Sequence, residues 1–237
     1  MWTIFRFRLC SQEFLRSKES MSKSTVLKKT ILFVKKRLSK EGTGHDWWHI
    51  ERVYNNARAI NKKEKADHFI VGLTVLLHDV GDRKVLGTVE DDYSIAENFL
   101  RKVKVSENDI KEVLFIIRNM SFSHSLNKKQ ANISKEFQVV QDADRLDALG
   151  AIGIARTFAY GGSKQRPLYD PTKRPQNINT TANYRKLNSS SFHHFYEKIL
   201  VLKNLMNTET GKTIAIERHK YLQEYMKQFL LEWDGER

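Results

Sequence analysis

The sequence predicts an all-α fold, and three of its features support that prediction. Proline is rare, with 3 residues among 237, and glycine is modest, with 11. Apolar residues recur at the three- and four-residue spacing of helices, whereas the alternating pattern of β-strands is scarce. A hydrophobic content of 40% allows one sizeable core or two small ones. Since the chain contains no internal repeat or strong domain boundary, we expect a single helical domain over residues 24–237.

Residues 1–23 are expected to be an N-terminal extension to this domain. Arginines interrupt the one apolar run at the N-terminus, which makes it a poor signal peptide. No helical period connects this segment with the residues that follow. Met21 begins the polar sequence Met-Ser-Lys-Ser, so Met1 and Met21 are both open as the natural start. We expect the extension to be disordered or to lie upstream of the natural protein.

Three helices are expected at the start of the domain. Apolar residues at helical spacing, opposite a face of lysines, predict an amphipathic helix over residues 25–40, which a Gly-Thr-Gly sequence ends. A second helix follows over about residues 46–63. Residues 69–77 are apolar on nearly every face, which predicts a buried helix that ends at the pair His78-Asp79.

The middle of the domain is expected to contain three more helices. The first is a short helix over residues 91–100. Ser106 is a favourable N-cap for the second, with acidic residues in its first turn, and this helix stops near Met120. Residues 121–134 are polar and loop-like. From residue 137 to about residue 160 the chain is mostly apolar, which predicts a core helix that a Gly-Gly pair ends.

A long polar segment separates this core helix from the C-terminal helices. Residues 161–190 contain all three prolines and are rich in Asn, Thr, Ser, Lys and Arg. Loops of this length are usually functional or disordered, so we expect either a flap over a substrate or a solvated loop. Two amphipathic helices, over about residues 192–207 and 211–232, complete the chain.

The chain is strongly basic, with a formal net charge of +13 and a pI of about 9.7. This balance suits a nucleotide, a nucleic acid or an anionic membrane surface, although a solvated basic surface is its more common cause. No apolar stretch has the length of a membrane span, so no membrane partner is expected. The single cysteine, Cys10, excludes an internal disulfide framework and is typical of the reducing cytoplasm, where we expect the protein to reside.

Two groups of polar residues interrupt the predicted core. His78 and Asp79 end the buried helix, and such groups are costly to bury unless they are paired or bind a metal. A metal ion is the leading explanation, and it requires further ligands elsewhere in the chain. His45, His49 and Arg52 share one helical face by their spacings of four and three. The second group lies in the predicted core helix and consists of Asp142, Asp144, Arg145 and Asp147.

Taken in chain order, these segments resemble the HD-domain phosphohydrolase superfamily, and in particular a subgroup of small bacterial HD hydrolases. The resemblance depends on a His followed by Arg-Val on a helix, a His-Asp pair after an apolar helix, and the segment 139–148. It extends to Ser121-Phe122-Ser123, to residues 142–162 and to His194-Phe195-Tyr196-Glu197-Lys198, and covers roughly residues 24–235. It implies a helical bundle of HD type with a metal site between the central helices.

The resemblance implies a set of metal ligands, residue by residue. They are His49, His78, Asp79 and one acid of Asp142-Ala143-Asp144. Residues two apart on a helix point about 200° apart, so both acids cannot face one ion. We prefer Asp144, because the superfamily's final acid commonly follows an alanine and precedes a basic and an aliphatic residue. Asp142 is the alternative ligand, or a partner of a metal-bound histidine. A buried polar network without metal is the other explanation of this set.

Two histidines and two carboxylates suit several divalent ions. We expect Mn²⁺ or Mg²⁺, with Co²⁺, Ni²⁺ and Fe²⁺ as alternatives, because ligand type alone does not choose among them. Asp79 would then be catalytic through the metal. Asp82 is a candidate to orient or deprotonate the attacking water, and a helix N-cap or turn explains this residue equally well.

Fixed cations near the metal are expected to hold phosphate oxygens. The candidates for substrate binding are Arg52, which we also count as catalytic, Arg83, Lys84 and Arg145. Guanidinium groups clamp phosphate in a bidentate manner, which favours the arginines over the lysine. For Arg145, and for Arg156 further along the chain, a structural ion pair with Asp147 is an equally good explanation.

The resemblance implies metal-dependent hydrolysis of nucleotides. The leading reaction is cleavage of a nucleoside or deoxynucleoside triphosphate to the monophosphate and pyrophosphate, and a 5′-nucleotidase that releases phosphate is the alternative. A hypothesis of another class is a basic module that binds nucleic acid or a nucleotide through a non-catalytic HD site. We expect no stable nucleic-acid complex, because no single-strand motif, zinc finger or recognition-helix pair is evident. The oligomeric state is open, with a homodimer as one option.

Overall fold

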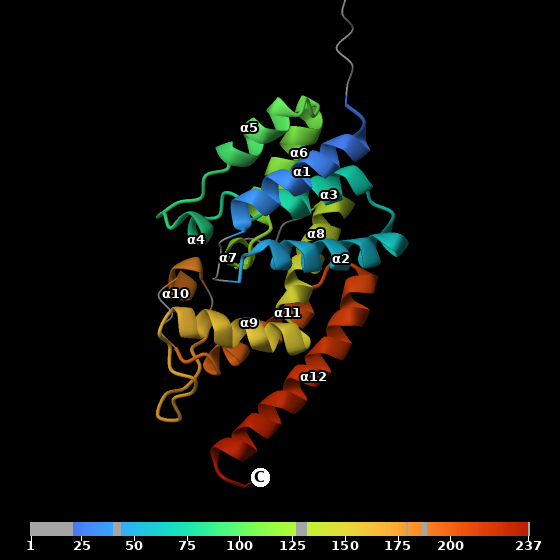
Figure 1. Ribbon diagram of the computed structural model, residues 1–237. Coiled ribbons are helices and arrows are strands. Elements are labelled where there is room, and N and C mark those ends of the chain that lie inside the picture. Colours follow the sequence, from blue (N-terminus) through green and yellow to red (C-terminus); the bar gives the residue numbers. More distant parts are fainter. Residues whose placement is uncertain (1–20, 40–43, 127–131, 179, 186–188, 237) are drawn as a thin grey trace, which may run out of the picture.

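The computed structural model describes residues 21–236 except for 40–43, 127–131, 179 and 186–188. Within these residues the regular structure is helical and contains no strand, which confirms the all-α prediction (Figure 1). The prediction about the N-terminal extension falls almost wholly outside the described residues. No helix in the described part of the chain is long and apolar enough to cross a membrane.

The helices occur in the following order. They are α1 (Lys23–Leu38), α2 (Trp47–Glu64), α3 (His68–Leu77), α4 (Arg83–Leu86), α5 (Ser94–Lys102), α6 (Glu107–Asn119), α7 (Phe122–Ser125), α8 (Lys135–Asp147), α9 (Gly150–Ser163), α10 (Thr181–Arg185), a π-helix (Phe195–Ile199), α11 (Leu200–Leu202), a 3-10 turn (Lys203–Leu205) and α12 (Glu209–Trp233).

Helices α2, α3 and α8 form the centre of the molecule. Every residue of α3 from Phe69 to Leu77 is buried, as the continuous apolar run predicts. Helix α2 packs along α8, and both contact α3, which α1 and α6 cover on its other sides. Helix α12 packs against α8 and α9 and then extends away toward the C-terminus (Figure 1). The four residues of the preferred ligand set, His49, His78, Asp79 and Asp144, lie on these three central helices or directly after α3.

Side-chain caps fix where the helices begin. Asp46 caps α2 by accepting a hydrogen bond from the backbone N–H of His49, and Ser106 caps α6 as predicted. Ser134 and Thr208 cap α8 and α12 in the same way. Each cap contributes about 1 kcal/mol of helix stability, because it satisfies a donor that the first turn leaves without a partner. The cap at Asp46 therefore also places His49 in the first turn of α2.

The predicted core helix over residues 137–160 is two helices, which is a correction. Helix α8 ends at Asp147 and α9 begins at Gly150, whose φ of +68° lies in the left-handed region that favours glycine. The apolar pattern continues through this break, so periodicity alone does not reveal it. The turn brings Arg156 of α9 back to Asp147, where its Nη1 donates to Oδ2 at 2.9 Å.

Three polar or amphipathic segments also differ in detail from the prediction. The polar segment 121–134 contains the short helix α7, and the flap-like segment 161–190 contains α10. The segment 192–207 is a π-helix followed by one turn of α-helix and a 3-10 turn rather than one α-helix. Helix α10 lies against α7, where the hydroxyl of Thr181 donates to the carbonyl of Ser123.

Candidate metal centre

The structure brings together all four residues of the preferred ligand set. Nε2 of His49 lies 3.3 Å from Nε2 of His78, 3.3 Å from Oδ2 of Asp79 and 3.5 Å from Oδ1 of Asp144. Nε2 of His78 lies 3.4 Å from Oδ1 of Asp79 and 3.9 Å from Oδ1 of Asp144. We call these four residues the metal-centre cluster.

Each central helix supplies part of the metal-centre cluster. His49 comes from the first turn of α2, and His78 is the C-cap of α3 with Asp79 directly after it. Asp144 lies on α8. The His49, His78 and Asp79 side chains are almost fully buried, whereas 35% of the Asp144 side chain is exposed. The cluster is therefore open to solvent on the side of Asp144.

Hydrogen bonds determine which nitrogen of each ring faces the cluster. Nδ1 of His49 lies 2.7 Å from Oδ2 of Asp147, and Nδ1 of His78 lies 2.8 Å from the carbonyl of Val75. Both partners accept hydrogen bonds, so each Nδ1 carries the proton and donates. The Nε2 lone pairs then point into the cluster, in the arrangement typical of histidines that bind metals.

The distances from His49 to the other three residues fit ligands of a single divalent ion. Two donor atoms about 2.1 Å from one ion lie roughly 3.0 Å apart at a right angle and roughly 3.4 Å apart at a tetrahedral angle. The distances of 3.3–3.5 Å that join His49 to the other three residues fall in or next to this range. Two imidazole and two carboxylate donors suit Mn²⁺, Mg²⁺, Fe²⁺, Co²⁺ or Ni²⁺.

The charges around His49 also favour a cation at this position. Burial opposes protonation of the ring, but the hydrogen bonds with Asp147 and Asp79 outweigh it and raise the pKa of His49 to about 9. Burial likewise opposes ionisation of Asp79, but the charges of His78 and His45 hold its pKa well below the usual range. The surrounding carboxylates therefore stabilise a positive charge, whether a proton or a metal ion supplies it.

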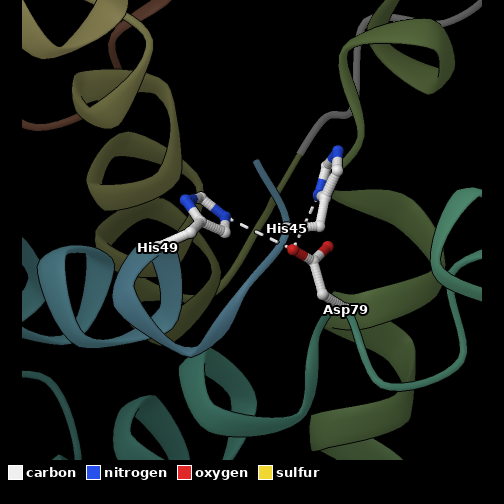
Figure 2. Close-up of side chains that lie close together, drawn as sticks. All are labelled: His45, His49 and Asp79. Atoms are coloured by element: carbon white, nitrogen blue, oxygen red, sulfur yellow. Dashed lines mark hydrogen bonds and ion pairs between the residues drawn. The ribbon is translucent and has the colours of Figure 1, made fainter. Parts of the chain in front are cut away.

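His45 holds Asp79 from the side opposite His49. Figure 2 shows the two rings on either side of the Asp79 carboxylate, with both contacts converging on one oxygen. Nδ1 of His45 lies 2.8 Å from this oxygen, Oδ2, and the His45 side chain is mostly buried. His45, His49 and Asp79 form a second grouping whose ligand atoms could hold an ion. Their arrangement fixes the orientation of Asp79 within the cluster.

Asp147 anchors the other side of His49. Its carboxylate accepts from Nδ1 of His49, from Nε and Nη2 of Arg52 at 2.8 and 3.1 Å, and from Nη1 of Arg156. Burial would raise the pKa of Asp147, but the hydrogen bonds from His49 and Arg52 lower it to about 2. Sequence reasoning left the roles of Asp147 and His45 open. The spacing of three between Asp144 and Asp147, which places both on one face of α8, is the signal that could have identified Asp147.

Two residues predicted for the site have structural roles instead. Asp142, the alternative metal ligand, is fully buried and accepts hydrogen bonds from the backbone N–H groups of Asn207 and Thr208, at the start of α12. Arg145, predicted to bind phosphate, is buried and donates to the carbonyl of Leu205. Both side chains thus join α8 to the chain before α12, which corrects these two predictions.

The remaining predicted residues lie near the cluster. Arg52 makes a bidentate ion pair with Asp147, so the structure gives it a role in supporting His49. Asp82 caps α4 by accepting from the N–H of Lys84 at 2.7 Å, and its role toward water stays a prediction. Arg83 and Lys84 lie in α4, directly after Asp82. The turn before α4 requires Gly81, because a Cβ there would overlap the carbonyl of Asp92.

Known structures resemble this fold over most of the chain. A protein from Lactobacillus plantarum is 37% identical, with a TM-score of 0.82, over 91% of this chain and 100% of that one. An HD-superfamily hydrolase from Bacillus thuringiensis is 43% identical, with a TM-score of 0.68, over 90% of this chain and 99% of that one. YpgQ of Bacillus subtilis, crystallised in complex with ADP, is 36% identical, with a TM-score of 0.70, over 88% of this chain and 95% of that one.

Sequence comparison leads to the same group of proteins. The family model of the HD domain matches residues 47–149, which include all four residues of the metal-centre cluster. YpgQ is 38% identical over 196 residues, which cover 83% of this chain and 88% of YpgQ. The helical fold and the His/Asp centre define a metal-dependent phosphohydrolase. The chain belongs to the HD-domain phosphohydrolase superfamily.

Proposed function

We propose that this phosphohydrolase acts on nucleotides and cleaves nucleoside or deoxynucleoside triphosphates to the monophosphate and pyrophosphate. The observation that carries the proposal is the convergence of His49, His78, Asp79 and Asp144 at a site that is open on the side of Asp144. The complex of YpgQ with ADP supports a nucleotide as the substrate class. The basic character of the chain suits an anionic substrate of this kind.

The proposed roles of the residues follow from their positions. Nε2 of His49, Nε2 of His78 and the carboxylates of Asp79 and Asp144 would hold a divalent ion, with Mn²⁺ or Mg²⁺ expected. A bound ion of this kind polarises a phosphoryl group and acidifies water. His45 and Asp147 keep Asp79 and His49 in place through their hydrogen bonds. Asp82, beside the cluster, is proposed to orient the water, and Arg83 and Lys84 to bind the substrate phosphates.

Hydrolysis of a nucleotide panel by the metal-stripped protein tests this function. Mn²⁺, Mg²⁺, Co²⁺ or Ni²⁺ is added back, and phosphate and pyrophosphate are assayed separately. The two ends of α3 provide a matched pair of variants, because His78 belongs to the metal-centre cluster and His68 is exposed at the opposite end. We expect pyrophosphate release that requires metal, is lost in His78→Ala and persists in His68→Ala.

Three other outcomes would change the proposal. Phosphate release from a monophosphate would indicate the 5′-nucleotidase reaction at the same centre. Nucleotide binding without turnover under any ion would indicate a non-catalytic HD module. Steeply salt-dependent binding of RNA or DNA without turnover would indicate a nucleic-acid-binding protein. Equal activity of His78→Ala and wild type would show that the metal-centre cluster does not carry the reaction.

A further inference from the structure

A group of basic residues lies outside the metal-centre cluster and has no part in holding it. We call Lys84, Arg166 and Lys198 the distal cations. They come from three separate parts of the chain: α4, the residues after α9, and the π-helix. Nζ of Lys198 donates to the hydroxyl of Tyr184 at 3.1 Å. It also lies 5.2 Å from the ring centroid of Phe122 and 5.4 Å from that of Tyr184.

All three distal cations act on the same two side chains. Burial raises the pKa of the Tyr184 phenol, but Lys198, Lys84 and Arg166 outweigh it and lower the pKa. Burial and the same three cations lower the pKa of His194 to about 3. Since electrostatic influence falls with distance, the three cations lie near both groups. The guanidinium group of Arg166 also lies 5.8 Å from the ring centroid of Tyr160, near the end of α9. Tyr184 and His194 mark the region of the distal cations.

Lys84 links this region to the metal centre. Burial opposes the charge of Lys84, but its interactions with Tyr184, Asp82, Tyr160 and Asp79 raise its pKa. Asp79 belongs to the metal-centre cluster, and Tyr184 belongs to the region of the distal cations. The ammonium group of Lys84 therefore lies within electrostatic range of both. The backbone places Lys84 close to the cluster as well, because the N–H of Lys84 donates to Asp82, and the N–H of Asp82 donates to the carbonyl of Asp79 at 3.1 Å.

The positive charge of this region is only partly balanced. Within the described part of the chain, neither Lys84 nor Lys198 forms an ion pair. Glu197, which lies next to Lys198 in sequence, accepts from the N–H of Gln176 at 3.1 Å and from the hydroxyl of Ser189 at 2.6 Å, so its carboxylate holds the flap-like segment. The ammonium groups of Lys84 and Lys198 are therefore available to an anionic ligand, and a bound polyanion would interact with both.

The flap-like segment contributes directly to this region. Tyr184 of α10 packs edge-on against Phe122 of α7, with 5.3 Å between the ring centroids. The contact between Thr181 and Ser123 holds α10 in the same place. Lys198 lies on a π-helix, a form that occurs frequently at functional sites because it re-aims side chains within a helix. Two aromatic rings thus hold the Lys198 ammonium group in a fixed position.

We propose that Lys84, Arg166 and Lys198 bind the phosphates that lie beyond the phosphate at the metal centre, and that Tyr184 positions Lys198 for this role. The site would then select nucleoside triphosphates over monophosphates, because only the longer chain of phosphates reaches all three cations. This inference rests on the proposed function, since it assumes a nucleotide at the metal centre.

The test compares how tightly the Mn²⁺-loaded full chain binds two ligands. One is an α,β-methylene nucleoside triphosphate, which the proposed cleavage cannot hydrolyse, and the other is the corresponding monophosphate. The variants Lys84→Met and Lys198→Met keep the aliphatic part of each side chain and remove its charge. Lys220→Met, at an exposed position on α12, is the control. Calorimetry gives the dissociation constants, and circular dichroism confirms that each variant is folded.

We expect wild type to bind the triphosphate analogue at least about tenfold more tightly than the monophosphate, since one charge-assisted hydrogen bond contributes about 1.5–3 kcal/mol. Each of the two variants should weaken binding of the analogue by about tenfold and change binding of the monophosphate by less than about twofold. Lys220→Met should match wild type. Wild type without a preference, or variants that keep the full preference, would overturn the inference. A wild-type protein that prefers the triphosphate analogue but hydrolyses no nucleoside triphosphate would instead count against the proposed function alone.

Discussion

Asp147 and His49 are joined by a buried hydrogen bond of 2.7 Å that fixes how His49 faces the metal centre. The two residues are far apart in sequence, and α8 and α2 bring them together by packing along each other. Arg52 and Arg156 hold the Asp147 carboxylate from two further sides. The orientation of a metal-binding histidine therefore depends on residues that do not touch the metal themselves.

The first prediction concerns this hydrogen bond. Asp147→Asn keeps the size of the side chain but removes the charge that stabilises the protonated Nδ1 of His49. We expect affinity for Mn²⁺ to fall about 10- to 100-fold, because this is the usual effect of losing such a partner. Titration of the stripped variant with Mn²⁺ measures it. Asp142→Asn, on the same helix but away from the cluster, is the control and should keep the affinity of wild type. An Asp147→Asn variant that binds Mn²⁺ as tightly as wild type does would contradict this role of Asp147.

The second prediction concerns Asp142 and the stability of the fold. This carboxylate is fully buried and accepts from the backbone and side chains of Asn207 and Thr208. Asp142→Ala leaves these donors without a partner, so we expect the free energy of unfolding to fall by about 3 kcal/mol or more. Urea denaturation measures this change. A loss below about 1 kcal/mol would show that the contact between α8 and α12 does not depend on Asp142.

The third prediction separates Arg145 from substrate binding. Its guanidinium group is buried and donates to the carbonyl of Leu205. Arg145→Met should therefore lower the unfolding temperature while leaving the KM for the nucleotide within about twofold of wild type. Steady-state kinetics below the unfolding temperature of the variant tests this. A KM raised by about tenfold with unchanged stability would restore the earlier interpretation of Arg145 as a phosphate ligand.

The sequence was sufficient to predict the all-α fold and to select the four residues of the metal-centre cluster. His49, His78-Asp79 and Asp144 lie in short segments whose order and neighbours are visible without any structure. The role of Asp147 depends on the packing of α2 along α8, and the role of His45 depends on the chain direction before α2. Neither role can be predicted from the local sequence pattern. The break at Gly150 was missed for the same reason, because the apolar pattern runs through it.

The basic candidates show a second limit of sequence reasoning. Arg52, Arg83, Lys84 and Arg145 are all close in sequence to predicted metal ligands. The structure pairs Arg52 with Asp147 and turns Arg145 toward Leu205. Proximity in sequence to a ligand therefore does not predict where a long side chain points. Lys198 and Arg166 lie far along the chain from Lys84, yet all three act on Tyr184 and His194.

The fourth prediction concerns the pH dependence of stability. The unfolded chain protonates His194 near pH 6.5, whereas the folded protein does so only near pH 3. Between these values the unfolded state binds more protons, so stability falls as the pH decreases from about 6.5 toward 3 and does not change through this group above that range. We expect His194→Asn to lose less stability than wild type between about pH 7 and pH 5.

The urea midpoints of wild type and His194→Asn, each measured at about pH 7 and pH 5, give this difference in stability. His68→Asn provides the control, because His68 is exposed and its replacement should leave the pH dependence of wild type unchanged. An identical change of midpoint in His194→Asn and wild type would contradict the prediction.

Titration of the metal-stripped protein with Mn²⁺ tests the central claim most directly, because it asks whether the four residues hold an ion before any substrate is involved. We predict one tightly bound ion per chain in wild type and in His68→Ala, and none bound with comparable affinity in His49→Ala or Asp79→Asn. Folded wild type that binds no divalent ion, or variants that bind it as tightly as wild type, would contradict the assignment of His49, His78, Asp79 and Asp144 as a metal centre.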